Sequence, residues 1–245
     1  MRTFLISRSR IHLNLRGAIP AAKRSRYVRS HLNYMAWDPL TEASLARATR
    51  ILARRDRELA AIHERLGPPP LWARPPGFAT LVKIILEQQV SLASAASIFA
   101  RLKKNTVPFT PARMIELGES HLKSLGLTRQ KTAYCLHLAE SLHDKRLRLS
   151  RLALMPDSEA KAALMAIKGL GSWSADVYLL MVLRRPDIWP AGDLALATAA
   201  QKVKGLPQRP NPEQLIQLAE GWRPYRSVAA RMLWQFYLAR RTEVS

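Results

Sequence analysis

Hydrophobic residues recur along most of the chain at intervals of three and four, with charged residues between them. The segment from Asp38 to Leu66 shows this pattern well, at Leu40, Leu45, Ile51, Leu52, Leu59 and Ile62. Such spacing places the apolar side chains on one face of a helix. No window shows the sustained alternation of β-branched and polar residues that strands require. We therefore predict an all-α chain with about ten helices.

Glycine and proline residues divide these helices. Gly67 and the prolines that follow it end the first helical segment and lead into an irregular connection. The apolar stretch 78–102 is predicted as one long helix or a helix pair with a soft break at 88–91. Further helices are predicted at 111–117, 121–125, 128–143, 158–167, 172–184, 194–203, 212–219 and 225–240. The aromatic residues of the last one are interpreted as core: Trp234, Phe236 and Tyr237.

The balance of charge indicates the class of partner. The chain has 39 Lys and Arg residues against 18 Asp and Glu residues, a formal net charge of +21. This excess favours a polyanion, and nucleic acid is favoured over a membrane because no stretch is long and apolar enough to span a bilayer. A ribosome-associated basic protein is the alternative. The single cysteine, Cys135, excludes an intramolecular disulfide and a four-cysteine iron–sulfur cluster, and it fits a reducing compartment.

The segment 1–37 contains several arginines and one lysine, Lys23, but no acidic residue. We interpret it as a basic, disordered N-terminal extension that precedes a true start at Met35. A DNA-binding arm and an organellar transit peptide are the alternatives, whereas arginines interrupt any apolar stretch that a secretory signal would need.

A short glycine-rich turn joins two of the predicted helices. Gly169-Leu170-Gly171 follows a helix that ends at Ile167 and Lys168, and the next helix begins near Ser172. Two glycines around one apolar residue make a tight turn whose backbone another chain can approach closely. The amides that begin the second helix can hold a DNA phosphate. An ordinary glycine-capped turn is the alternative.

About twenty residues later comes a loop that ends in an acid, Trp189-Pro190-Ala191-Gly192-Asp193. Turn and loop together resemble the helix-hairpin-helix, Gly-Pro-Asp superfamily of base-excision DNA glycosylases, and within it the 3-methyladenine DNA glycosylase II type. Three further segments resemble that type: 78–99 with its Gln-Gln-Val-Ser break, 126–139, and 222–230. The resemblance covers most of the chain.

The resemblance implies that Asp193 is the catalytic carboxylate. Cleavage of an N-glycosidic bond leaves an oxocarbenium-like sugar, and a fixed carboxylate near the anomeric carbon stabilises that charge and orients an attacking water. Asp193 is also well suited to cap the helix predicted at 194–203. Both roles are compatible, because a cap position fixes the direction of the side chain.

Trp173 stands where superfamily members that also cut the DNA backbone carry a lysine. That lysine forms a Schiff base with the sugar, so its replacement implies a monofunctional glycosylase that uses water. Aromatic ring faces attract a positively charged, alkylated purine, which makes Trp173, Trp189 and Tyr178 candidates for the base pocket. Packing between helices is the alternative for each of them.

The resemblance also implies where DNA is contacted. Phosphate contacts are expected from the hairpin residues Lys168, Gly169, Leu170, Gly171 and Ser172. Gln88 and Gln89 lie at the break from which a residue would enter the duplex as the damaged nucleotide leaves the stack. Some relatives have leucine at the position of Gln89, which leaves the identity of this wedge open, and a buried or helix-turn role is the alternative for Gln88. Glu87 replaces a residue that is often glycine in the family. The hairpin of the family can hold a monovalent cation through backbone carbonyls; no other cofactor is expected.

The implied fold is all-α, with two helical lobes around a central cleft and no N-terminal sheet domain. The segments 38–80 and 205–245 would form one lobe from both ends of the chain. The segment 81–204 would form the central lobe, with the hairpin helices at 164–184 and the catalytic loop at 189–193.

The implied activity is hydrolytic release of alkylated purines such as 3-methyladenine from double-stranded DNA, by a monomer that flips the damaged base. A non-enzymatic helix-hairpin-helix protein that binds damaged or structured DNA is the alternative. The expected location is the bacterial cytoplasm, at the nucleoid, or an organelle or nucleus if the basic N-terminus is a targeting segment.

Overall fold

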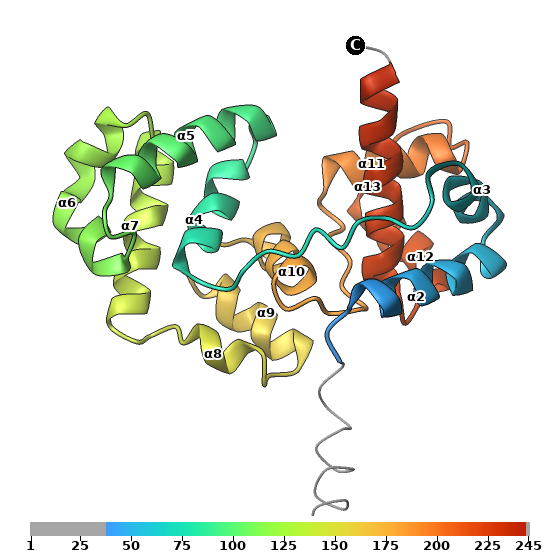
Figure 1. Cartoon of the computed structure of the whole chain (residues 1–245), viewed down its shortest axis with the longest axis horizontal. Helices are drawn as coiled ribbons and strands as arrows, with labels where there is room; N and C mark the ends of the chain where they lie inside the picture. The colour runs from blue at the N-terminus through green and yellow to red at the C-terminus, as the bar shows by residue number, and fades with distance from the viewer. Residues whose placement is uncertain (1–37, 244–245) are drawn as a thin grey trace, which may run out of the picture. The chain divides into compact units, whose positions relative to one another are not determined.

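The computed structural model describes residues 38–243, so the predicted basic extension 1–37 lies outside the described residues, as do 244–245. The described part contains helices and no strand, which confirms the all-α prediction (Figure 1). The elements are α2 (Glu42–Arg55), α3 (Arg57–Leu66), α4 (Phe78–Glu87), α5 (Leu92–Asn105), α6 (Pro111–Ser124), α7 (Arg129–His143), α8 (Leu149–Leu152), α9 (Asp157–Met165), α10 (Ser172–Met181), α11 (Leu194–Val203), α12 (Pro212–Ala219), η1 (Glu220–Trp222) and α13 (Arg226–Glu243). No helix in this part is long and apolar enough to cross a membrane.

Short polar side chains fix where many of these helices begin. The N-cap residues Thr41, Ser91, Thr110, Thr128 and Asn211 each accept a hydrogen bond from a backbone amide of the first turn. A cap of this kind satisfies an amide that has no partner within the helix and typically contributes about 1 kcal/mol. The beginnings of these helices are therefore set locally by the sequence.

The helices pack into two groups. The central lobe consists of α4, α5, α6, α7, α9 and α10, and the terminal lobe consists of α2, α3, α11, α12, η1 and α13 (Figure 1). Helix α11 was predicted within the central lobe, in the segment 81–204, and this boundary is wrong. The helix instead packs on α13 and α12, with Leu196, Ala199 and Ala200 buried.

One buried cation ties the lobes together. The guanidinium of Arg231, on α13, donates to the carbonyls of Leu71 at 2.9 Å, Leu180 at 2.8 Å and Ser227 at 3.0 Å. These carbonyls belong to the connection between α3 and α4, to α10 and to α13 itself. Burial lowers the pKa of Arg231 to about 10, which still leaves it charged near neutral pH.

Two details of the helix pattern concern breaks. The predicted soft break at 88–91 is confirmed, since α4 ends at Glu87 and α5 begins at Leu92. The segments 111–117 and 121–125, predicted as two helices, form α6 with a kink at Gly118, whose φ is 70°. Helix α8 was not predicted, because one helical turn is too short to show a period.

Candidate active site

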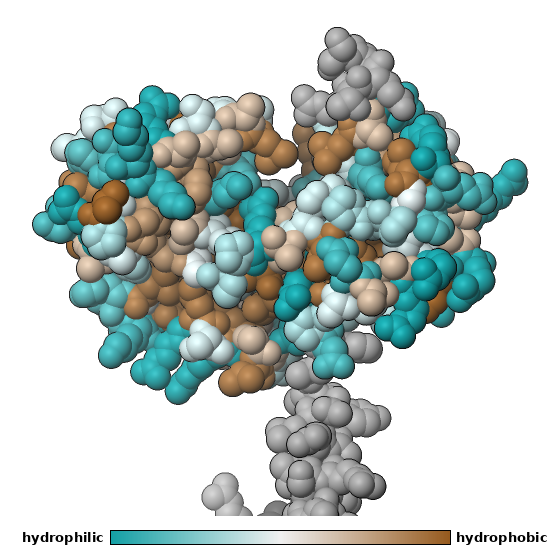
Figure 2. Space-filling model, in the orientation of Figure 1, coloured by the Kyte–Doolittle hydropathy of each residue, from teal (hydrophilic) through white to brown (hydrophobic). Residues whose placement is uncertain are grey.

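A cleft of about 1540 Å³ is lined by both lobes. Its walls come from the α3–α4 connection, the end of α4, α7, the α9–α10 hairpin, α10, the loop before α11, and α13. Figure 2 shows the surface hollowed between the lobes, with hydrophobic residues at the edges of the hollow. The exposed apolar side chains that line the cleft are Val90, Leu92, Met165, Leu194 and Leu238.

Asp193 lines this cleft and is held by three hydrogen-bond donors. Its Oδ1 accepts from the backbone amide of Leu196 at 2.8 Å and from Nε1 of Trp234 at 3.1 Å. Its Oδ2 accepts from Nε1 of Trp173 at 2.8 Å. The residue is only 9% exposed, so the carboxylate is fixed in direction and largely shielded from bulk water.

The predicted helix cap at Asp193 is confirmed, and it leaves the carboxylate in the cleft. Capping uses Oδ1, while Oδ2 has one neutral donor, the indole N–H of Trp173. A carboxylate oxygen can accept more than one hydrogen bond. The same side chain can therefore begin α11 and face a bound substrate.

The two hairpin glycines have different structural roles. Gly169 has a φ of +96°, and a Cβ there would lie 2.6 Å from the Cβ of Tyr134, so only glycine fits. Gly171 is the N-cap of α10, with a φ of −77° and open space where a Cβ would be. Among the described residues no side chain caps α10. Its first amides thus remain available to an anion.

The other hairpin residues lie at the cleft as well. Lys168, Leu170 and Ser172 are among its lining residues. The side chain of Leu170 is 2% exposed and packs into the core, so only its backbone can meet DNA. Lys168 and Ser172 are exposed and can present side chains to a phosphate.

Gln88 and Gln89 differ in their surroundings. Nε2 of Gln88 donates to the carbonyl of Gly169 at 2.8 Å and to Oγ of Ser174 at 2.9 Å. Gln88 therefore braces the hairpin, which is the helix-turn role given above as its alternative. Gln89 is exposed at the turn between α4 and α5, with a φ of +56°, and stays a candidate for contact with the duplex.

Of the three predicted pocket aromatics, Trp173 alone lines the cleft. Tyr178 is fully buried, and burial raises the pKa of its hydroxyl to about 12. It follows Trp173 by five residues, which turns it about 140° around α10, whereas Val177 shares the face of Trp173. Trp189 is buried against Trp222, with ring centroids 5.3 Å apart. The pocket assignments of Tyr178 and Trp189 are corrected to core packing.

Four aromatic residues of the cleft were not predicted as pocket residues: Trp72, Tyr134, Trp234 and Tyr237. The rings of Trp72 and Trp234 meet edge to face, with centroids 6.5 Å apart. Trp234, Tyr237 and Leu238 stand at helical spacing and share one face of α13, so periodicity groups them but does not say what they face. Trp72 lies in an irregular connection with a φ of 47°, and no periodic signal marks it.

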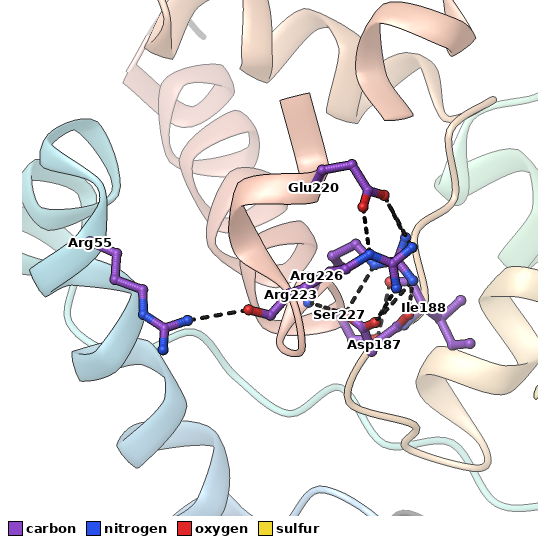
Figure 3. Close-up of polar contacts among 7 residues, drawn as sticks. All are labelled: Arg55, Asp187, Ile188, Glu220, Arg223, Arg226 and Ser227. Carbon is purple, nitrogen blue, oxygen red and sulfur yellow. Dashed lines mark hydrogen bonds and ion pairs between the residues drawn. The ribbon is translucent and has the colours of Figure 1, made fainter. Parts of the chain in front are cut away.

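A polar brace holds the loop that leads to Asp193 (Figure 3). Asp187 accepts from Arg226, through Nε at 3.0 Å and Nη2 at 3.0 Å, and from Nη1 of Arg223 at 2.9 Å. Ser227 Oγ accepts from the amide of Ile188 at 2.8 Å and donates to its carbonyl at 3.1 Å. The loop is thus fastened to the start of α13, the helix that also supplies an indole donor to Asp193.

One lysine amine lines the cleft from α7. Nζ of Lys131 donates to the carbonyl of Leu86 at 2.6 Å, near the C-terminal end of α4. A cation is favourable at that end of a helix. Partial burial nevertheless lowers the pKa of Lys131.

The known proteins that this chain resembles are named as DNA glycosylases or glycosidases. "Alkylbase DNA glycosidase-like protein mag2" of Schizosaccharomyces pombe is 27% identical over 201 residues, which span 79% of this chain and 94% of that protein. "DNA-3-methyladenine glycosylase 2" of Escherichia coli is 27% identical over 223 residues, spanning 83% of this chain and 76% of that protein. A crystal structure of the DNA-3-methyladenine glycosidase from Bacillus halodurans matches with a TM-score of 0.69 at 27% identity, covering 80% of this chain and 91% of that one.

The family profile covers the hairpin, the loop that carries Asp193 and the part of the cleft between them. The profile described as "HhH-GPD superfamily base excision DNA repair protein" matches residues 82–224. This match spans more than half of the chain. The chain belongs to the HhH-GPD superfamily of base excision DNA repair proteins.

Proposed function

We propose that this protein hydrolyses the N-glycosidic bond of alkylated purines such as 3-methyladenine in double-stranded DNA and leaves an abasic site. The observation that carries the proposal is the carboxylate of Asp193, fixed in a cleft with aromatic walls beside a hairpin whose amides are free to hold phosphate. The names of the relatives support the same chemistry.

In the proposed reaction Asp193 stabilises the positive charge that develops on the sugar. Its three donors hold the carboxylate in place before the substrate binds, so little reorganisation is needed when the bond breaks. Its burial strengthens the interaction with the cationic sugar. Oδ2 accepts one hydrogen bond, from Trp173, and its remaining acceptor capacity orients the attacking water.

The hairpin and the aromatic walls position the substrate. The amides at the start of α10 and the side chain of Lys168 hold the backbone of the DNA without reading its sequence. The flipped base stacks between the rings of Trp72, Trp173 and Trp234, whose faces attract a cationic purine.

We propose hydrolysis by water because no amine among the described residues of the cleft is placed to form a Schiff base with the sugar. Trp173 occupies the position of the Schiff-base lysine, and the amine of Lys131 donates to the carbonyl of Leu86.

A monovalent cation would be held by hairpin carbonyls, of which those of Ile167 and Gly169 already accept hydrogen bonds. A carbonyl oxygen that accepts one hydrogen bond keeps a second lone pair, and a cation held there would add positive charge near the phosphate.

Replacement of the carboxylate by an amide tests the proposal. Asp193→Asn keeps an oxygen for the amide of Leu196 but turns an NH₂ group toward the indole N–H of Trp173. We expect the single-turnover rate of base release from alkylated duplex DNA to fall about a hundredfold or more, with nearly unchanged DNA affinity.

Asp56 provides a matched control for this substitution. It also caps a helix, accepting from the amide of Leu59 at 3.0 Å, and it also accepts from an indole, Nε1 of Trp222 at 2.7 Å. Asp56→Asn should lower thermal stability while base release persists. Binding without base release by the unaltered protein would instead establish the non-enzymatic alternative. Covalent capture on DNA by borohydride would contradict hydrolysis by water.

A further inference from the structure

An ion pair lines the cleft and has no part in the mechanism above. Nη1 of Arg74, in the α3–α4 connection, lies 2.7 Å from Oε2 of Glu87, the last residue of α4. The side chain of Glu87 is 5% exposed and that of Arg74 is 21% exposed. Both residues line the cleft that holds Asp193.

The other charged groups of the cleft already have a use. Asp193 accepts from three donors, Lys131 donates to a backbone carbonyl, and Lys168 lies on the hairpin. Because the carboxylate of Glu87 is buried and Arg74 is only partly exposed, the cost of removing both charges from water offsets much of their attraction, and the pair contributes little to stability. Polar groups placed at the wall of a largely apolar cleft are candidates for substrate contact, because such groups fix the orientation of a ligand.

The pair does not have to fasten the connection to the helices. The backbone amide of Arg74 donates to the carbonyl of Met181 at 3.0 Å. Oγ1 of Thr80 donates to the carbonyl of Pro75 at 2.6 Å. These bonds fasten the connection to α10 at Arg74 and to α4 at Pro75 without the ion pair.

The pair offers a donor and an acceptor next to each other. Its contact joins one guanidinium nitrogen to one carboxylate oxygen, so the guanidinium keeps further N–H groups and the carboxylate keeps a second oxygen. The edge of a purine has the complementary pattern: the amino group of adenine stands beside a ring-nitrogen acceptor, and the N1–H of guanine or hypoxanthine stands beside O6. Aromatic walls bind every purine face and cannot read this pattern.

We propose that Arg74 and Glu87 are specificity residues that read the donor and acceptor edge of the flipped purine. They favour lesions that keep an N–H donor beside an acceptor, as in 7-methylguanine and hypoxanthine. They disfavour 1,N6-ethenoadenine, whose added ring removes the donor. The inference rests on the proposed glycosylase function and deepens it.

The experiment replaces the pair by two apolar side chains of similar length. Arg74→Met combined with Glu87→Met removes both polar groups without leaving one buried charge unpaired. Single-turnover base release is measured on duplexes that contain hypoxanthine, 7-methylguanine or 1,N6-ethenoadenine. We expect the unaltered protein to prefer the two donor-bearing lesions, and the double variant to lose about tenfold or more of its rate on them with little change on ethenoadenine.

Asp56→Asn is the control, since it changes a paired carboxylate that does not line the cleft. It should leave the ratio between lesions unchanged. Two results would overturn the inference and leave the glycosylase function standing. The first is release of ethenoadenine by the unaltered protein as fast as, or faster than, release of the donor-bearing lesions. The second is a folded double variant whose ratio of rates between donor-bearing lesions and ethenoadenine lies within twofold of the ratio for the unaltered protein. Absence of base release from every lesion by the unaltered protein would refute the glycosylase function and this inference with it.

Discussion

The two glycines of the hairpin permit a prediction that separates folding from DNA binding. Gly169→Ala places a methyl group 2.6 Å from the Cβ of Tyr134, and the backbone there has a φ of +96°. Movement of a flexible side-chain end cannot relieve the clash, because the atoms of Tyr134 that clash lie at the base of its ring. Gly171→Ala makes the same chemical change two residues later, where the φ is −77° and the space is open.

The expected magnitudes follow from these geometries. A non-glycine residue in a left-handed conformation costs about 1–2 kcal/mol, and overpacking costs about 1–3 kcal/mol. For a domain of this size the sum corresponds to a melting temperature lower by roughly 5–15 °C. At Gly171 we expect a change in the free energy of unfolding within about 0.5 kcal/mol.

Thermal denaturation followed by circular dichroism measures the stability of both variants. Titration with a duplex that contains an abasic-site analogue measures their DNA affinity. Gly171→Ala should weaken DNA binding severalfold at an unchanged melting temperature, since its methyl group stands where the proposed contact needs close approach of the backbone. A Gly169→Ala variant that melts within about 2 °C of the unaltered protein would refute the steric argument. Unchanged DNA affinity of Gly171→Ala would refute the proposed phosphate contact.

Three further predictions concern the groups that support the site. Trp173→Phe removes the indole donor to Oδ2 of Asp193 but keeps an aromatic wall, so we expect the base-release rate to fall about tenfold with DNA affinity within twofold; an unchanged rate would show that this hydrogen bond does not matter. Arg226→Met leaves Asp187 with fewer donors and loosens the loop that carries the carboxylate, so thermal stability should fall by about 2–3 kcal/mol and the base-release rate should fall more than DNA affinity; loss of stability alone would mean that the brace is only structural. Burial raises the pKa of Asp56, but hydrogen bonds from Lys204, Trp222 and the amide of Leu59 outweigh it and leave the pKa below its ordinary value. Because the folded-state pKa is the lower one, the stability from this carboxylate is present above the unfolded-state pKa, about 4, and is lost as pH falls through the folded-state value; urea unfolding of Asp56→Asn and the unaltered protein should converge at acidic pH, and a difference constant from pH 7 to pH 2 would contradict the assignment.

The sequence by itself determined the features that depend on neighbours along the chain. The helical period predicts most of the helices, because it reports which side chains share a face over a few turns. The break at 88–91, the cap at Asp193 and the hairpin at Gly169 follow from local backbone requirements in the same way. The resemblance of the hairpin and the loop to a repair family then indicated the chemistry, and the family match agrees with it.

Only the tertiary structure decided which aromatic residues line the cleft. Trp173 and Tyr178 lie on the same helix, yet Trp173 lines the cleft and Tyr178 is in the core. Which side of a helix meets the cleft depends on how helices far apart in the sequence cross. The pairing of Arg74 with Glu87 depends on the same packing, because it joins the connection between the lobes to the end of α4. A periodic pattern records that a face is apolar, and only the packed neighbours decide whether that face meets core or substrate.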